Sequence, residues 1–326
     1  MKRFLIGVVF VSMIAVSLSF VSETHAKDPI VLKMTTFLPK GDPTMTAWLA
    51  LIDDINAKAK GELIIKYVGG PEAIPGFKQF EAVKKGIVDM IFSAESYYGG
   101  EVTKVAYTHL SRLSPQEERK KGYYDYRVEL LKKQNVFYLG RAAHHIWFQV
   151  YTNKVVKRPQ ELKGQKLRVS ATYEPFIKAI GAVPITMSGG DVYTALERGV
   201  IDGYAWAATG NIGFGWPEVC KYILEPRIYT MNVEGLMNLN TWNKLPPHLQ
   251  KLIMDAMINN EIQYAQTMAG LAEKEYKDMQ AKGMKVIKFS PEDTKWYVDL
   301  AYKAGWDEVI KRSPEIGPKL KQLLSP

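Results

Sequence analysis

The chain has 326 residues, of which 47% are hydrophobic and 24% are charged, and its formal net charge at pH 7 is +9. Its single cysteine, Cys220, excludes an intramolecular disulfide, and the length is sufficient for a large buried core that needs none. Lysine and arginine are scattered among acidic residues, so we expect no nucleic-acid partner. The positive charge either attracts small anions or serves solubility alone.

The first 26 residues have the pattern of a secretory signal peptide. Lys2 and Arg3 precede an apolar run from Phe4 to Phe20, and Thr24-His25-Ala26 has small residues at the positions that a signal peptidase reads. We expect cleavage after residue 26 and export to a bacterial periplasm. Removing Lys2, Arg3 and Glu23, a net of +1, leaves a charge of +8 on the mature chain. An uncleaved membrane anchor is the alternative.

The mature chain begins with a predicted strand over Val31–Phe37. A helix then starts at Asp42-Pro43, a favoured N-cap followed by a favoured first helical residue, and ends at Gly61. A second strand is predicted over Glu62–Tyr67. The loop Gly69–Gly76 is rich in Gly and Pro and leads from a strand to a helix. Loops in that place often line ligand sites, although the same composition suits a simple connection.

Two distant segments, Phe80–Met90 and Tyr193–Gly203, share one pattern. In each, an aromatic residue and an apolar residue three positions later lie on one helical face, and a glycine typical of a helix C-cap follows. Two β-branched residues and an aspartate, Asp89 or Asp202, then indicate a short buried strand. The repeat predicts two α/β lobes of similar build, an arrangement that can trap a ligand in the cleft between them.

A capping box at Ser114–Glu117 opens a helix that we expect to continue to about Lys133. The elements that follow alternate between strand and helix, which predicts a parallel sheet covered by helices. They are Val136–Leu139, Ile146–Thr152, Leu162–Ser170, Tyr173–Gly181, Val183–Met187, Gly190–Arg198 and Val200–Trp206.

The final third differs from the rest. Arg227–Asn240 is predicted as one long strand. A helical pattern then runs without a breaker from Pro247 to Gly283, about 54 Å at 1.5 Å per residue, which is long enough to follow both lobes. Met284–Phe289 is predicted as a strand, and Ser290 as the cap of a last helix.

The predicted fold class is therefore α/β, a two-lobed periplasmic binding protein fold with an interlobe cleft and a long helix running along both lobes. We expect lobe 1 to comprise residues 27–150 and 236–280, and lobe 2 to comprise residues 151–235 and 281–326.

Familiar catalytic signatures are scarce, because the chain has no dinucleotide fingerprint, P-loop, HExxH, CxxC or GxSxG motif. We accordingly predict no catalytic residue, no cofactor and no metal site. His144 and His145 are adjacent on a predicted strand, so their side chains point to opposite faces and cannot share an ion. The amides of Ser188–Asp191 could meet an anion at a helix start, but an ordinary N-cap explains them as well. Cys220 is expected to be an inert buried thiol.

Arg168 is the main candidate for binding. In the predicted strand Lys166–Val169, Leu167 and Val169 point one way and Arg168 the other. A guanidinium at a strand end facing a cleft matches a carboxylate with two hydrogen bonds. The alternative is a surface arginine paired with a glutamate or aspartate.

From Gly164 to Trp206 the chain resembles the solute-binding proteins of TRAP (tripartite ATP-independent periplasmic) transporters, the DctP-like family. The resemblance rests on the segments Leu162–Val169, Ile180–Pro184 and Asp191–Gly203, and it extends over nearly the whole mature chain. It implies two lobes that close on a small organic carboxylate clamped by Arg168. It also implies delivery of that solute to the membrane subunits of a TRAP permease.

The departures from the family pattern concern the ligand. The sialic-acid branch has Asn in place of Trp206, Phe in place of Gly189 and a second Arg near Phe148, so the resemblance argues against a polyhydroxylated sugar acid. Gly189, Gly190 and Trp206 are closer to the 2-oxo acid branch. That branch has an acidic residue associated with a metal ion just before the tryptophan, whereas this chain has Ala205, so we expect no accompanying cation.

Further pocket candidates are mostly aromatic, and each could equally belong to the core. Adjacent strand residues such as Trp147 and Phe148 cannot both face the cleft. An apolar chamber around one charged anchor suits a monocarboxylate with an apolar or aromatic body better than a dicarboxylate, which would need a second cation. The candidates are Phe37, Ile74, Phe77, Tyr97, Trp147, Phe148 and Gln149.

The sequence thus predicts a monomeric, non-catalytic periplasmic solute-binding protein that delivers a small organic carboxylate to a TRAP permease. A binding protein for a 2-oxo or 2-hydroxy acid is the nearest alternative. A periplasmic enzyme acting on a carboxylic acid, or a sensor reporting to a receptor kinase, is an alternative from another class. The carboxylates available to such an enzyme are those of Glu72, Asp89, Glu95 and Asp202, of which Asp89 and Asp202 are expected to be structural.

Overall fold

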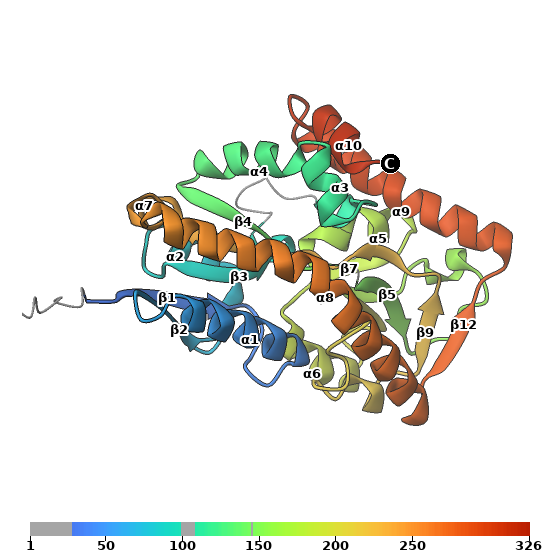
Figure 1. The fold of residues 1–326 in the computed structure, drawn as a ribbon. Coiled ribbons are helices and arrows are strands. Elements are labelled where there is room, and N and C mark those ends of the chain that lie inside the picture. Colours follow the sequence, from blue (N-terminus) through green and yellow to red (C-terminus); the bar gives the residue numbers. More distant parts are fainter. Residues whose placement is uncertain (1–27, 99–107, 145) are drawn as a thin grey trace, which may run out of the picture.

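The computed structural model describes residues 28–98, 108–144 and 146–326. These residues form two β-sheets covered by helices, and one long helix runs beside both sheets (Figure 1). The α/β, two-lobed fold predicted from the sequence is confirmed. The predicted signal peptide lies outside the described residues.

The first sheet has the strand order β2-β1-β3-β11-β4. Strand β1 pairs in parallel with β2 and β3, whereas β11 pairs antiparallel with β3 and β4. The central strand β3 is buried along its whole length, as its continuous apolar sequence requires. The strands span Ile30–Thr36 (β1), Leu63–Gly69 (β2), Met90–Ala94 (β3), Val136–Ala143 (β4) and Val233–Asn238 (β11).

The second sheet has the order β12-β9-β5-β8-β6-β7, and β10 pairs with β5 outside this path. Strand β6 is parallel to β7 and β8, and β5 is antiparallel to β8. The strands span Trp147–Thr152 (β5), Lys166–Val169 (β6), Val183–Thr186 (β7), Gly203–Ala207 (β8), Tyr222–Glu225 (β9), Ile228–Thr230 (β10) and Lys285–Lys288 (β12).

Helices α1, α3 and α9 begin at the capping residues that the sequence predicts. The Asp42 carboxylate accepts the amide of Thr44, Ser114 and Glu117 form the reciprocal capping box, and Ser290 accepts the amide of Asp293. The helices span Pro43–Lys58 (α1), Gln79–Lys84 (α2), Pro115–Lys120 (α3), Tyr123–Lys132 (α4), Glu174–Ala179 (α5), Val192–Glu197 (α6), Leu239–Lys244 (α7), Pro247–Ala281 (α8), Pro291–Arg312 (α9) and Gly317–Leu324 (α10).

Two predicted elements are each divided in the structure. The helix expected from Ser114 to Lys133 is broken between α3 and α4 by Gly122, whose φ of +81° is a left-handed conformation that ends the first helix. The long strand expected over Arg227–Asn240 consists of β10 and β11, which belong to different sheets. The predicted end of this strand at Asn240 is also wrong, because Asn238 already caps α7 by accepting the amide of Thr241.

Helix α8 has 35 residues and runs beside both sheets, as predicted from the length of its helical pattern. Beside the first sheet, Glu261 accepts two bonds from Arg119, at 2.8 and 2.9 Å. Farther along, Glu275 accepts the amides of Gly210 and Ile212, at 2.8 and 3.0 Å, in the segment that follows β8. Within the described part of the chain, no helix combines the length and apolar character needed to cross a membrane.

The sequence repeat forms the same unit in both lobes. A short helix, α2 or α6, ends at a glycine with positive φ (Gly86 at +72°, Gly199 at +67°) and leads into β3 or β8. The aspartate before each strand accepts a backbone amide of the neighbouring parallel strand, since Asp89 bonds Lys33 and Asp202 bonds Lys166, both at 2.8 Å. Both carboxylates hold strands together, as expected for structural residues.

The chain crosses between the sheets just before β5 and again between β10 and β11. These crossings lie a few residues ahead of positions 150 and 235, where the sequence predicts lobe boundaries. The carboxyl ends of β3 and β8 lie close together near these crossings, and the candidate site lies where they meet.

Candidate functional site

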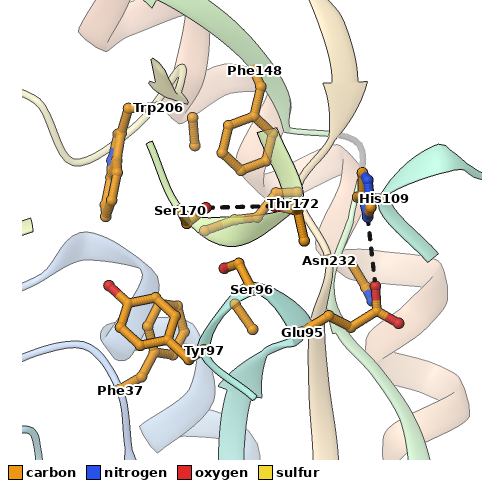
Figure 2. A pocket seen from close by; sticks show the side chains of 13 residues that line it. Phe37, Glu95, Ser96, Tyr97, His109, Phe148, Ser170, Thr172, Trp206 and Asn232 are labelled. Carbon is orange, nitrogen blue, oxygen red and sulfur yellow. Dashed lines mark hydrogen bonds and ion pairs between the residues drawn. The ribbon is translucent and has the colours of Figure 1, made fainter. Parts of the chain in front are cut away.

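A cavity lies where β3 of the first lobe and β8 of the second lobe end. It holds about 470 Å³ of empty space, part of it open to solvent. Both strand ends contribute to it, through Ala94 and Ala207. The lining residues are Phe37, Ala94, Glu95, Ser96, Tyr97, His109, Phe148, Ser170, Thr172, Trp206, Ala207, Met231 and Asn232 (Figure 2).

One end of the cavity is aromatic. The ring of Tyr97 lies 4.9 Å from that of Phe37 and stacks at 4.6 Å on Phe77, and all three come from the first lobe. Trp206 faces them from the second lobe. Phe37, Tyr97 and Trp206 also border a neighbouring hollow lined by Phe77 and Gly189. A Cβ at position 189 would lie 3.2 Å from the Trp206 ring, so the glycine allows the tryptophan its close approach.

Arg168 lies at this aromatic end, buried behind the cavity wall and fully inaccessible to solvent. Its Nε donates to the carbonyl of Met187 at 3.0 Å and its Nη1 to that of Ala205 at 3.4 Å. The guanidinium carbon is 4.7 Å from the centre of the Trp206 ring. Burial lowers the pKa of Arg168, and Tyr97 opposes that effect. An arginine remains charged under these conditions.

The charge of Arg168 has no directly contacting acidic partner in the part of the chain that the structure describes, although the more distant Asp191 raises its pKa. Arg127 and Arg141 are buried to the same degree, but Arg127 contacts Glu95 and Glu234, and Arg141 contacts Glu118 at 2.7 Å. No ion pair involves Arg168 among the described residues, and its Nη2 has no hydrogen-bond partner there. A buried charge without an ion-pair partner is costly, so this guanidinium is chemically suited to an anion.

The other predicted binding residues divide into two groups. Phe37, Tyr97, Phe148 and Trp206 line the cavity, and Phe77 and Gly189 line the adjoining hollow. Ile74 packs against the hydrophobic cluster around Phe80 instead. Gln149 is fully buried and lines neither space, although its Nε2 has no partner among the described residues. Trp147 lines a separate hollow, as expected from its alternation with Phe148.

The opposite end of the cavity is polar, and few features of the sequence indicated this. Glu95, named only as a carboxylate for an alternative enzyme, directly follows the repeated strand β3. Ser170 and Thr172 follow β6, two and four residues after Arg168, so proximity to that residue was the available signal. His109 and Asn232 lie in connecting segments that carry no motif. Long-range folding brings all five to one cavity, with Ser170 and Thr172 nearer its middle (Figure 2).

A buried ionic cluster supports this polar end. One nitrogen of Arg127 lies 2.9 Å from Glu95 and 2.6 Å from Glu234, and the Thr108 amide and hydroxyl donate to Glu95 at 2.6 and 2.7 Å. Burial alone would raise the pKa of Glu95, but Arg127, His109 and Thr108 hold it below its ordinary value. Burial raises the pKa of Glu234, with Arg127 opposing. These contacts favour the ionised form of the Glu95 carboxyl group, which lines the cavity.

The remaining sequence candidates have local roles. Glu72 accepts the amide of Gly70 at 2.7 Å, and the Ser188 hydroxyl donates to Asp191 at 2.6 Å. His144 bonds the backbone carbonyl of Glu261, whereas His145 lies outside the described residues. Among the residues described, no cluster of His, Cys, Asp and Glu is suited to a metal ion. Burial raises the pKa of the Cys220 thiol to about 12, which agrees with an inert buried thiol.

Two sheets joined by crossing segments and a shared helix, with a cavity at their junction, define a two-lobed solute-binding protein. The model of the bacterial extracellular solute-binding proteins, family 7 (DctP), matches residues 34–312. The chain therefore belongs to this family, the solute receptors of TRAP transporters.

Individual relatives are distant in sequence but close in fold. A monocarboxylate 2-oxoacid-binding periplasmic protein of Nostoc is 23% identical over 80% of this chain and 74% of its own length. A Bordetella pertussis receptor that binds pyroglutamic acid is similar with a TM-score of 0.76 and 22% identity over 90% of this chain and 98% of its own. A Desulfovibrio salexigens TRAP protein with bound orotic acid gives a TM-score of 0.80 and 21% identity over 90% and 97% of the two chains.

Proposed function

We propose that this protein is a periplasmic receptor that captures a small organic monocarboxylate between its lobes, with Arg168 as the carboxylate anchor, and delivers it to a TRAP permease. The observation that carries the proposal is the contrast among the buried arginines. Arg127 and Arg141 each have a protein carboxylate, whereas the Nη2 of Arg168 has no partner among the described residues. A ligand carboxylate supplies the absent anion with charge-assisted hydrogen bonds.

The position of Arg168 couples binding to closure. Its guanidinium belongs to the second lobe, and Tyr97, which opposes the effect of burial on its pKa, belongs to the first. Because the guanidinium lies behind Tyr97 and Trp206, we expect these two side chains to move apart when the carboxylate enters. A ligand that contacts both lobes stabilises the closed form by the difference between its affinities for the closed and open forms.

A 2-oxo or 2-hydroxy monocarboxylate is a second candidate ligand class. The Nostoc relative is named for 2-oxo acids, and Gly189 and Trp206, which the sequence resemblance associates with that branch, lie against each other. The cavity is apolar around Phe37, Phe148 and Trp206 and holds acceptor groups at its far end. A dicarboxylate would place its second charge beside the ionised Glu95.

The test begins with native mass spectrometry of the purified mature protein, which identifies any copurified acid. Calorimetry then measures binding of mono-, di- and 2-oxo carboxylates to protein refolded without ligand. We expect monocarboxylates to bind without turnover, and Arg168→Ala to weaken binding by at least about 2 kcal/mol, roughly 30-fold.

Arg158→Ala is the matched control, because Arg158 is an exposed arginine of the same lobe whose charge already contacts Asp293. Its affinity should equal that of the parent protein. Unchanged affinity in Arg168→Ala, exclusive binding of dicarboxylates, or conversion of the bound acid in a mass-spectrometric time course would overturn the proposal.

A further inference from the structure

Asn232 lies at the polar end of the cavity, in the crossing between β10 and β11. Its side chain lines the cavity and is almost completely buried. Figure 2 shows it beside Glu95 and His109, with Trp206 at the opposite end and Ser170 and Thr172 between. It is therefore placed to meet the part of a ligand most distant from the Arg168 end.

The orientation of the Asn232 amide follows from its neighbour. Its Nδ2 lies 3.2 Å from Oε1 of Glu234, whose other oxygen receives Arg127 at 2.6 Å and the hydroxyl of Tyr98. In the structure the Asn232 NH₂ group is the donor of this bond and faces Glu234. The Oδ1 atom then faces away, and in the described part of the chain it has no hydrogen-bond partner.

A buried carbonyl oxygen without a partner costs free energy that a suitable ligand recovers. The nearby carboxylate of Glu95 is also an acceptor and is ionised, so this end offers acceptors and repels a second negative charge. A methyl or phenyl group here would leave Oδ1 unsatisfied. A hydroxyl or amide N–H would satisfy it.

We propose that the cavity selects monocarboxylates that carry an uncharged hydrogen-bond donor, a hydroxyl or an amide N–H, at the end remote from the carboxylate, and that Asn232 Oδ1 is the acceptor that recognises it. This inference rests on the proposed function, because it assumes that the carboxylate occupies the Arg168 end. It narrows the ligand class from acids with a wholly apolar body to acids with a polar tip.

The test compares three homologous series of short straight-chain acids by calorimetry on the refolded mature protein. One series ends in a hydroxyl, the second in a methyl group of similar size, and the third in a methoxy group that accepts but cannot donate. At the best-fitting chain length, we expect the hydroxy acid to bind about tenfold more tightly than the other two, within the 1–3 kcal/mol typical of an unmatched buried polar group.

Asn232→Leu is nearly isosteric and removes the acceptor, so the advantage of the hydroxy acid should fall below about threefold while the methyl-terminated acid retains or gains affinity. Asn259→Leu, at an exposed position of α8, is the matched control and should keep the full advantage. The comparison of the three series in the parent protein needs no variant, so it decides the matter even if Asn232→Leu does not fold.

The possible failures are distinguishable. If carboxylates of all three series bind equally well and Arg168→Ala still loses them, the proposed function stands and the role of Asn232 is refuted. Stronger binding of the methoxy series would show that the amide presents its nitrogen to the cavity, which also overturns the inference. If no carboxylate binds, both proposals fail.

Discussion

The two lobes contain the same unit but place different chemistry on it. In the first lobe Asp89 bonds the amide of Lys33, and in the second Asp202 bonds the amide of Lys166. Two residues beyond these lysines lie Thr35 and Arg168. The Thr35 hydroxyl donates to the carbonyl of Gly69 at 2.6 Å, and Arg168 Nε donates to that of Met187 at 3.0 Å.

Thr35 and Arg168 thus each donate one hydrogen bond to a backbone carbonyl at the end of the neighbouring outer strand. Only the arginine has further donor groups. The difference continues one residue past the repeated strands, where Glu95 follows Ala94 and Ala208 follows Ala207. A cation from one lobe and an anion from the other then lie at opposite ends of the cavity. Duplicated backbone geometry with unlike side chains produces a polarised site.

The largest predicted effect concerns the buried arginines, Arg127 in the first lobe and Arg168 in the second. Arg127 neutralises two buried carboxylates of the first lobe, so Arg127→Met should lower the free energy of unfolding by about 3–5 kcal/mol. Arg168→Met removes a charge that has no acidic partner in the described residues, so the ligand-free protein should keep its stability or gain some. Urea denaturation of both variants without ligand measures the difference.

Exposed Arg158→Met serves as the surface control and should change the unfolding midpoint little. Equal losses in Arg127→Met and Arg168→Met would contradict the assignment of a structural role to one arginine and a binding role to the other.

A second prediction concerns Glu118, a buried carboxyl group of the first lobe that contacts Arg141. Burial raises the pKa of Glu118 to about 7, although Arg141 opposes the shift. The native state therefore binds a proton between pH 4.5 and 7 that the unfolded state has released. The stability from this group is fully present below the unfolded pKa and is lost as the pH rises through 7.

Glu118→Gln removes the titration without changing the size of the side chain. The free energy of unfolding of the parent minus that of the variant should fall by about 3 kcal/mol between pH 4.5 and pH 8. Urea titrations of both proteins across this range provide the measurement, and the subtraction cancels the other titrating groups. A difference that is constant with pH would show that Arg141 keeps Glu118 ionised throughout.

The duplicated unit could be predicted from the sequence because its determinants are local. Helix caps at Asp42, Ser114 and Ser290 and the two helix–glycine–strand repeats depend on neighbouring residues, and the structure confirms them. Arg168 was also identifiable, through its strand position and the family resemblance, although its role remains a proposal.

The polar end of the cavity could not be predicted in this way. His109 and Asn232 join Glu95 only because strands distant in sequence pair in one sheet, and neither residue belongs to a periodic pattern. The division of Arg227–Asn240 into two strands has a similar origin. Whether a segment with strand propensity stays in one sheet or changes to another depends on tertiary pairing, which local propensity does not encode.

The smallest predicted effect tests the shared scaffold itself. Asp89→Ala removes the acceptor of the Lys33 amide and of the Thr241 hydroxyl, and Asp202→Ala removes that of the Lys166 amide together with an exposed contact to Lys154. Because the same strand-to-strand bond is lost, each change should reduce the free energy of unfolding by about 1 kcal/mol. The two losses should add in the double variant, since the residues lie in different lobes and share no partner.

Ligand affinity should stay within about threefold of the parent protein, as measured by calorimetry, because neither carboxylate lines the cavity. A large loss of affinity in one variant alone would contradict the equivalence of Asp89 and Asp202. The two lobes would then differ in function at these aspartates, and not first at Thr35 and Arg168.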